Sequence, residues 1–247
     1  MMTKQPENLI YGIRAVIETI RSGKDMEKVF VQNKFNGELL PELNQLIKER
    51  DIPVSRVPNE KLSRLTRKNH QGVVAYVSPV KYFPLDQVVT QVFEEGKQPL
   101  FVLLDGVTDV RNFGSIARTA ECMGVNGLII PAKGSAQINA DAVKTSAGAL
   151  NFIPVCREPD LVRAVNYLKE SGIRIIGCTE KASGNFQKID LVGPACIIMG
   201  SEDVGISPAL LSLCDEVGEI PLSGSIESLN VGSACAMVLY EVSRQRG

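Results

Sequence analysis

The chain has 247 residues, 44% of them hydrophobic, and a formal net charge of −1. This length and apolar content suit a soluble globular protein with one large domain or two ordinary ones. No run of 18 apolar residues occurs, and the first residues lack the charged-then-apolar pattern of a secretory signal, so we expect a cytoplasmic protein with no membrane partner.

Residues 9–78 alternate helical and strand patterns, which predicts a small α/β domain over residues 1–80. The expected elements are helices at 11–21 and 38–50 and strands at 28–31, near Pro53 and at 72–77.

Basic residues gather near the end of this domain. Residues 1–80 carry a net charge of +4, whereas the rest of the chain carries −5. Five cations stand within thirteen residues against one acid, Glu60, and they are Arg56, Lys61, Arg64, Arg67 and Lys68. Such a run is commonly a solvated helix face, and it is also the charge pattern of an RNA-binding surface. Both interpretations stay open from the residues alone.

Residues 81–98 predict a linker followed by a connecting helix. They carry a weak helical pattern and end at Gly96 and Pro99, which are typical of a break between elements.

Residues 99–247 predict a second domain with a mostly parallel sheet, because apolar runs too short for helices alternate with helical patterns. The expected strands lie at 100–104, 127–130, 173–178, 195–199 and 216–220. Ser207 followed by Pro208 predicts the start of a helix, and Gly124 and Gly172 predict the ends of two others.

Three polar loops follow expected strands, at the edge where open parallel sheets bind ligands. They lie at 105–114, 200–207 and 220–230 and mix glycine with charged or amide residues. None matches G-x-G-x-x-G or G-x-x-x-x-G-K-[ST], so an ordinary dinucleotide or nucleoside triphosphate loop is disfavoured.

The last of these loops runs directly into an apolar helix. After Asn230, apolar residues recur at i, i+4, i+7, i+8 and i+11, which is one face of a helix packed on a core. Ser228 or Asn230 could cap that helix by accepting a hydrogen bond from a free backbone N–H. Capping and ligand binding are evenly matched for this loop taken alone.

Metal binding is not expected. The six cysteines include no Cys-x-x-Cys pair and most stand beside apolar residues, so they are expected to be reduced and buried. The single histidine, His70, has no cluster of other ligand residues near it in sequence and is interpreted as structural.

Taken together, the three loops resemble the motifs of a known family, the SpoU (TrmH-like) branch of the SPOUT superfamily of RNA 2′-O-ribose methyltransferases. The similar segments are 105–120, 198–207 and 220–231, in the order that the family has them. The first domain is similar to the L30e-like substrate-binding domain of many members, at residues 10–16 and 69–73.

The resemblance implies an α/β fold with two parts: a C-terminal SPOUT-type parallel sheet with a deep trefoil knot over 99–247, and a smaller N-terminal α/β (L30e-like) domain. It further implies a homodimer that binds S-adenosylmethionine in the knot. The positions that match the family's cofactor site are Met199, Gly200, Ile220, Leu222, Ser228, Leu229 and Asn230.

The resemblance also implies five catalytic positions, which are Arg118, Asn112, Glu202, Ser228 and Asn230. Arginine stays protonated in proteins and is a poor general base, so we hypothesise that Arg118 stabilises the developing alkoxide or holds an RNA phosphate. The two asparagines could hold the ribose or orient Arg118, and Glu202 could fix its guanidinium. Each residue alone also has an ordinary role as a cap, turn or solvated side chain; together, inside three ordered motifs, they favour catalysis.

Two residues depart from the family pattern. Val110 stands where many members have proline, and Gly232 stands where many have serine, so the fine geometry of both loops is expected to differ from the family pattern.

The expected substrate is RNA, without a metal. The arrangement of domains, with Ser-Ala-Gln-Ile-Asn-Ala at 135–140, is most similar to members that methylate a guanosine ribose in 23S rRNA, and tRNA guanosine enzymes come second. A non-catalytic RNA-binding ribosome-assembly factor is the alternative from another class. The basic run 56–68 is expected to engage phosphates.

Overall fold

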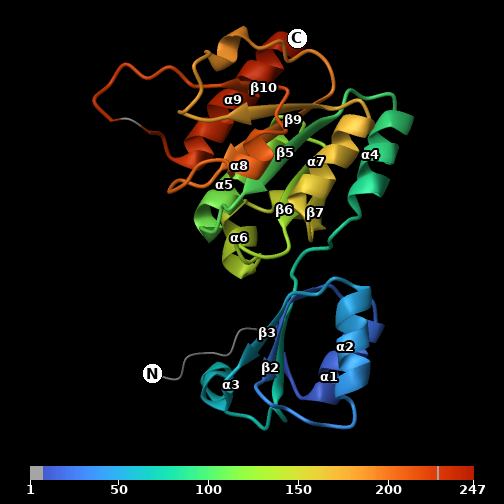
Figure 1. Ribbon diagram of the computed structural model, residues 1–247. Helices are drawn as coiled ribbons and strands as arrows, with labels where there is room; N and C mark the ends of the chain where they lie inside the picture. Colours follow the sequence, from blue (N-terminus) through green and yellow to red (C-terminus); the bar gives the residue numbers. More distant parts are fainter. Residues whose placement is uncertain (1–7, 227) are drawn as a thin grey trace. The chain divides into compact units, whose positions relative to one another are not determined.

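The structure, a computed structural model, describes residues 8–226 and 228–247. It divides between Lys81 and Tyr82 into a smaller and a larger compact unit (Figure 1). Over these two ranges, no helix is long and apolar enough to cross a membrane.

The smaller unit is a four-stranded sheet in the order β1-β4-β2-β3 with helices on both faces (Figure 1). Strand β2 is parallel to β3, and β4 is antiparallel to both of its neighbours. One face of the sheet packs against α1 and α2, and the other packs against α3. In chain order the elements are β1 (Leu9–Tyr11), α1 (Ile13–Arg21), β2 (Met26–Gln32), α2 (Leu40–Glu49), β3 (Val54–Val57), α3 (Asn59–Leu65) and β4 (Val73–Val77).

Helix α1 begins later than its sequence pattern predicts. Its buried residues, Ile13, Val16, Ile17 and Ile20, recur at helical spacing. Tyr11 lies before them in β1, and Gly12, with φ of +87°, turns the chain from strand to helix in a conformation that favours glycine. A strand of three residues is too short to show an alternating pattern, so the sequence predicts the helix to begin too early, within β1.

The larger unit holds a six-stranded sheet in the order β10-β8-β9-β5-β6-β7, in which every pair is parallel. The predicted parallel sheet is therefore confirmed. The strands are β5 (Leu100–Asp105), β6 (Gly127–Pro131), β7 (Val155–Glu158), β8 (Arg174–Cys178), β9 (Ala195–Gly200) and β10 (Glu216–Gly218). Strand β7 was not expected, because it is a four-residue edge strand whose last two residues are only partly buried and break the apolar run.

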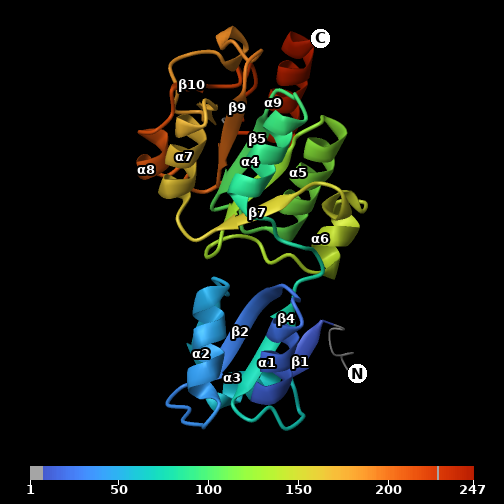
Figure 2. The same ribbon diagram turned by 90° about the vertical axis from the view of Figure 1, so that its right-hand side faces the viewer.

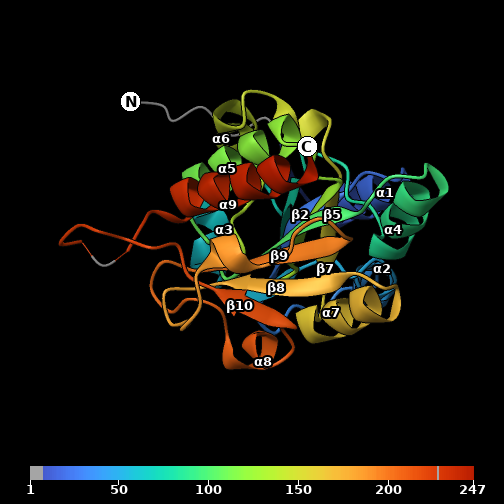
Figure 3. The same ribbon diagram turned by 90° about the horizontal axis from the view of Figure 1, so that it is seen from above.

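Helices cover both faces of the larger sheet. One face carries α4, α7 and α8, and the other carries α5, α6 and α9 (Figure 3); Figure 2 looks onto α4 and α7. The helices are α4 (Leu85–Glu94), α5 (Val110–Cys122), α6 (Ala140–Thr145), α7 (Leu161–Glu170), α8 (Pro208–Leu211) and α9 (Val231–Arg246), with 3₁₀ turns η1 (Ala149–Asn151) and η2 (Phe186–Lys188).

Helix α4 lies within residues 81–98, where the sequence predicts a linker followed by a connecting helix. Its apolar stripe, which includes Leu85, Val88 and Val92, is buried in the same core as Phe101 of the sheet. The weak helical pattern in the sequence is therefore the inner face of a helix that belongs to the larger unit.

The predicted helix boundaries at glycine and proline are confirmed. Ser207 precedes α8, which begins at Pro208. Gly124 and Gly172 have φ of +71° and +79° just after α5 and α7, so each ends its helix in the left-handed conformation.

Candidate active site

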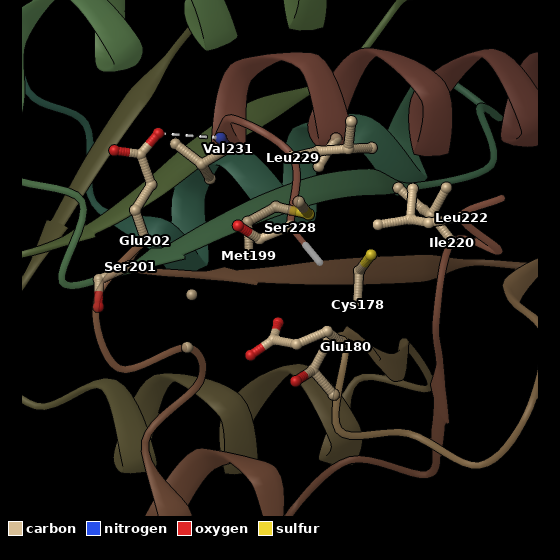
Figure 4. Close-up of a pocket in the computed structure, with 14 residues that line it drawn as sticks. Cys178, Glu180, Met199, Ser201, Glu202, Ile220, Leu222, Ser228, Leu229 and Val231 are labelled. Carbon is tan, nitrogen blue, oxygen red and sulfur yellow. Dashed lines mark hydrogen bonds between the residues drawn. The ribbon is translucent and has the colours of Figure 1, made fainter. Parts of the chain in front are cut away.

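A pocket lies beyond the carboxyl ends of β8 and β9, where open parallel sheets bind ligands (Figure 4). Its third wall is the segment that leads into α9. The lining residues are Cys178, Thr179, Glu180, Met199, Gly200, Ser201, Glu202, Gly205, Ile220, Leu222, Ser228, Leu229, Val231 and Ala234. Six of the seven residues assigned to cofactor binding from the sequence thus line one pocket, and Asn230 lies beside it.

Gly200 allows the tight turn that shapes one side of this pocket. The backbone N–H of Gly205 donates to the carbonyl of Ser201 at 2.9 Å, which folds the chain back on itself directly after β9. A Cβ added to Gly200 would lie 2.1 Å from the carbonyl carbon of Gly205, closer than any van der Waals contact. Only glycine fits at this position.

The three loops meet at one carboxylate oxygen, Oε1 of Glu202. It accepts hydrogen bonds from the side-chain amide of Asn112 at 3.1 Å, from that of Asn230 at 2.6 Å, and from the backbone N–H of Val231 at 3.2 Å. The Asn230 amide also donates to Oδ1 of Asn112 at 2.9 Å. We call these three side chains the Asn-Glu-Asn cluster.

Asn230 is both a helix cap and a member of this cluster. Its Oδ1 accepts from the backbone N–H groups of Gly232 at 3.0 Å and Ser233 at 3.3 Å, while its amide nitrogen faces Glu202. Capping and site formation therefore use opposite ends of one side chain. The carboxylate of Glu202 also lies at the N-terminus of α9, where the helix dipole favours a negative charge.

Asn112 is held by the start of α5. Asp109 caps that helix, and its Oδ1 accepts from the backbone N–H groups of Arg111 and Asn112, both at 2.8 Å. Helix α5 thus begins at Val110 without the proline that many family members have there.

Gly232 lies where α9 approaches α5 closely. It is buried, and a Cβ at this position would lie 3.3 Å from Oγ of Ser115 and 3.1 Å from Oδ1 of Asn230. A larger residue would press on both the neighbouring helix and the cap, so the departure from serine fits the local packing.

Arg118 does not join the cluster within this chain. Its side chain is exposed on α5 and makes no hydrogen bond to any other described residue. Glu202 bonds to the two asparagines, and its role toward the guanidinium stays a prediction. Ser228 does line the pocket and is exposed.

The sequence interpretation missed the residues at the end of β8 and just after it. Cys178 and Glu180 line the pocket, and the Glu180 side chain points into it (Figure 4). Burial, with a smaller effect from the Glu180 charge, raises the pKa of the Cys178 thiol to about 12, so this thiol is neutral near pH 7. The position of β8 next to β9 could have identified this loop, but strand order cannot be read from the sequence.

The charges around the pocket are of one sign. Two carboxylates, Glu180 and Glu202, line it, and none of the described lining residues is cationic. Leu222, Leu229 and Met199 supply apolar walls. A ligand with positive charge and a flat apolar part would suit this lining.

The basic residues of the smaller unit are not equivalent. The ammonium groups of Lys61 and Lys68 lie 5.7 Å and 5.6 Å from the ring centroids of Phe30 and Tyr11, within the range of cation–π contacts. Arg56 contacts Asn44 at 3.5 Å. Within the run 56–68, Arg64 and Arg67 are exposed and make no bond to any other described side chain, so these two are the best placed of the five to meet a ligand.

Comparisons with protein families match both units of the chain. Residues 99–240 match the model described as the SpoU rRNA methylase family, and residues 9–83 match the model described as RNA 2′-O ribose methyltransferase substrate binding.

Relatives match over nearly the whole length. A putative TrmH family tRNA/rRNA methyltransferase of Bacillus subtilis, YacO, is 34% identical over 98% of this chain and 97% of its own. A protein of the same description from Staphylococcus saprophyticus is 36% identical over 97% of this chain and 96% of its own.

Solved structures give the same picture. The SpoU methyltransferase AviRb from Streptomyces viridochromogenes, in complex with the cofactor AdoMet, has a TM-score of 0.62 and 26% identity, and covers 96% of this chain and 90% of that chain. The A. aeolicus TrmH/SpoU tRNA modifying enzyme has a TM-score of 0.56 and 30% identity, and covers 66% of this chain and 84% of that chain.

Proposed function

Because the chain belongs to the SpoU rRNA methylase family, we propose that it transfers a methyl group from S-adenosylmethionine to the 2′-hydroxyl of a guanosine ribose in 23S rRNA. The observation that carries the proposal is a pocket lined by the second and third family motifs, to which the first motif is joined through the Asn-Glu-Asn cluster. The trefoil knot stays a prediction.

The pocket fits the cofactor by charge and by shape. S-adenosylmethionine supplies an electrophilic methyl group on a positively charged sulfur. The carboxylates of Glu180 and Glu202 favour a cationic ligand, and the apolar walls at Ile220, Leu222 and Leu229 suit an adenine ring. Met199, Gly200 and Ser228 complete the wall.

The main task of the protein is to align the ribose with the methyl group. Alignment can lower such a barrier by about 7–11 kcal/mol, whereas proton transfer typically contributes about 10²- to 10⁴-fold in rate. The Asn-Glu-Asn cluster supports alignment, since it fixes the ends of two loops and the start of α9 against one carboxylate.

Arg118 is assigned to the RNA side of the reaction. Its exposed guanidinium has no partner among the described residues, so it is free to meet a phosphate or the developing alkoxide. The guanidinium is planar, and its paired N–H donors can bind two such oxygens at once. A phosphate held in this way could accept the proton that the 2′-hydroxyl loses.

A homodimer formed through α9 is part of the proposal. Met237 and Tyr240, 49% and 62% exposed, are one turn apart on this helix. They border a hollow of about 430 Å³ that Phe186 and Pro221 also line. A large exposed apolar face beside the active-site segment suits a self-complementary interface.

A second candidate substrate is tRNA, because the names of the relatives mention both tRNA and rRNA. Mapping 2′-O-methyl groups in rRNA and tRNA from cells that lack the protein separates the two. Loss of a methyl group from tRNA alone would reject the 23S assignment, and unchanged methylation of both would favour a non-catalytic RNA-binding factor.

Replacing Arg118 with lysine tests the role of the paired donors of its guanidinium. We expect Arg118→Lys to slow single-turnover methyl transfer about ten-fold or more at saturating RNA and cofactor, because lysine keeps the charge and loses the paired donors. Arg163→Lys, an exposed arginine on α7, is the matched control. Full retention of the rate in Arg118→Lys would exclude this role.

A further inference from the structure

A second concave site lies on the smaller unit and shares no residue with the pocket described above. It is an open groove with a volume of about 600 Å³ between the start of α1, the end of β2, the start of α3 and the loop 69–72. The Asn-Glu-Asn cluster and the cofactor pocket do not account for it.

The lining of this groove is rich in uncharged hydrogen-bonding groups. Gln32, Asn59, Asn69 and His70 are among its lining residues, while its two charged residues, Arg14 and Glu38, are opposite in sign. The side chains of Gln32 and Asn59 bond to no other described residue, so their donors and acceptors are available to a ligand.

The loop 69–72 is held in one conformation. The Oδ1 of Asn69 accepts from the backbone N–H of Gln71 at 3.3 Å, and Nδ1 of His70 accepts from that of Gly72 at 3.1 Å. Gln71 has φ of +47°, a conformation that costs a non-glycine residue energy and persists where the surroundings impose it. The other ring nitrogen, Nε2, lies 3.5 Å from Oγ of Ser63, so both nitrogens hold the ring in place.

An aromatic ring forms another part of the wall. Phe35 is half-buried and rests against two glycines. A Cβ on Gly72 would lie 2.4 Å from the Phe35 ring, and one on Gly37 would lie 3.0 Å from it. The two glycines therefore let the ring lie close to the backbone at the side of the groove.

We infer that this groove binds an unpaired nucleobase of the RNA, distinct from the nucleotide that is methylated. Side-chain amides read base edges, and aromatic rings stack on bases that are not paired. The inference rests on the proposed function only in that the ligand is RNA.

The charge distribution separates this groove from phosphate binding. Phosphates are held by cations, and among the described residues that line the groove the cation Arg14 is matched by the acid Glu38, whereas Arg64 and Arg67 do not line it. Cations outside a groove with no net charge are the arrangement expected when phosphate contacts position the RNA and base contacts select it.

The test compares two RNA probes, a hairpin with a single-stranded loop and a blunt duplex of the same length, by fluorescence anisotropy. The groove variant is Gln32→Ala with Asn59→Ala, and Gln45→Ala, an exposed amide on α2 outside the groove, is the control. We expect the groove variant to bind the hairpin about ten-fold more weakly and the duplex as wild type does.

Salt dependence gives an independent readout. The groove variant should keep the wild-type slope of log affinity against log salt for both probes, because it removes no charge. Arg64→Gln with Arg67→Gln should weaken both probes and reduce that slope by about 1.5. If the double variant unfolds, Asn59→Ala alone, at an exposed position, replaces it as the groove variant. Unchanged affinity for the cofactor shows that the larger unit is still folded.

Equal losses for hairpin and duplex, or no loss for either, would overturn the inference. Failure of the proposed function looks different. If the wild-type protein transfers no methyl group to any RNA while the groove variant still loses the hairpin selectively, the base-binding groove stands and the catalytic proposal falls.

Discussion

Glu202, Asn112 and Asn230 meet although they are distant in the chain: Glu202 is 90 residues from Asn112 and 28 from Asn230. Each is placed by its own surroundings. Asn112 follows the cap of α5, Asn230 caps α9, and Glu202 stands in the turn that Gly200 permits. Family motifs in the sequence indicated that the three act together, but nothing in their spacing could show that they share one oxygen atom.

Glu180 offers a test of the pocket's charge. S-adenosylmethionine carries a sulfonium charge that its product, S-adenosylhomocysteine, lacks. We expect Glu180→Gln to weaken binding of the cofactor about three-fold, the size of effect that an exposed carboxylate can have, and to change binding of the product less. Isothermal titration calorimetry with both ligands measures this.

Glu170→Gln, an exposed carboxylate on α7 outside the pocket, is the control for net charge. Equal weakening of cofactor and product would assign the effect to a group that both ligands share. No weakening of either would remove Glu180 from the site.

At the scale of elements, α9 is fastened at both ends. At its start Asn230 bonds to Glu202 and Asn112. At its end the Arg246 guanidinium donates to the carbonyls of Leu191 at 3.0 Å, Gly193 at 2.6 Å, Gln98 at 3.3 Å and Pro99 at 3.4 Å. The helix is therefore tied to segments that flank β5 and β9.

Removing the Arg246 guanidinium should destabilise the larger unit. We expect Arg246→Ala to lower its free energy of unfolding by about 2 kcal/mol, because four carbonyls lose a charged donor. Urea unfolding followed by circular dichroism measures the change, with Arg163→Ala as the control and Arg246→Lys as an intermediate case. A urea midpoint of Arg246→Ala equal to that of the control would show that the guanidinium contributes nothing to stability.

Elements with a continuous apolar pattern could be predicted, and those without one could not. The strands at the centre of the larger sheet, such as β5 and β9, are buried along their length and stand out as apolar runs. The short strand β1 and the edge strand β7 give no such pattern. The packing of α4 on the sheet depends on tertiary contacts that a single helical stripe does not specify.

At the scale of the whole molecule, each unit has a hydrophobic core of its own. We therefore expect residues 82–247 to fold without the smaller unit and to bind S-adenosylmethionine as the full chain does. RNA affinity and its dependence on salt should both fall, because the truncated chain lacks the groove and the free cations Arg64 and Arg67.

Calorimetry with the cofactor and anisotropy with RNA measure these two properties on the same protein. A truncated chain that binds RNA as tightly as the full chain would contradict the assignment of RNA binding to the smaller unit. Loss of cofactor binding in a folded truncated chain would contradict the independence of the pocket.

The position of α9 along the chain sets the order in which the pocket is completed during translation. Residues 178–180 and 199–205 emerge from the ribosome before the third wall, and Glu202 has neither Asn230 nor the N-terminus of α9 to bond until that wall follows. The Arg246 guanidinium then binds backbone carbonyls at the C-terminal end of the helix. A nascent chain thus has no complete cofactor site, and methyl transfer begins only after translation has passed α9.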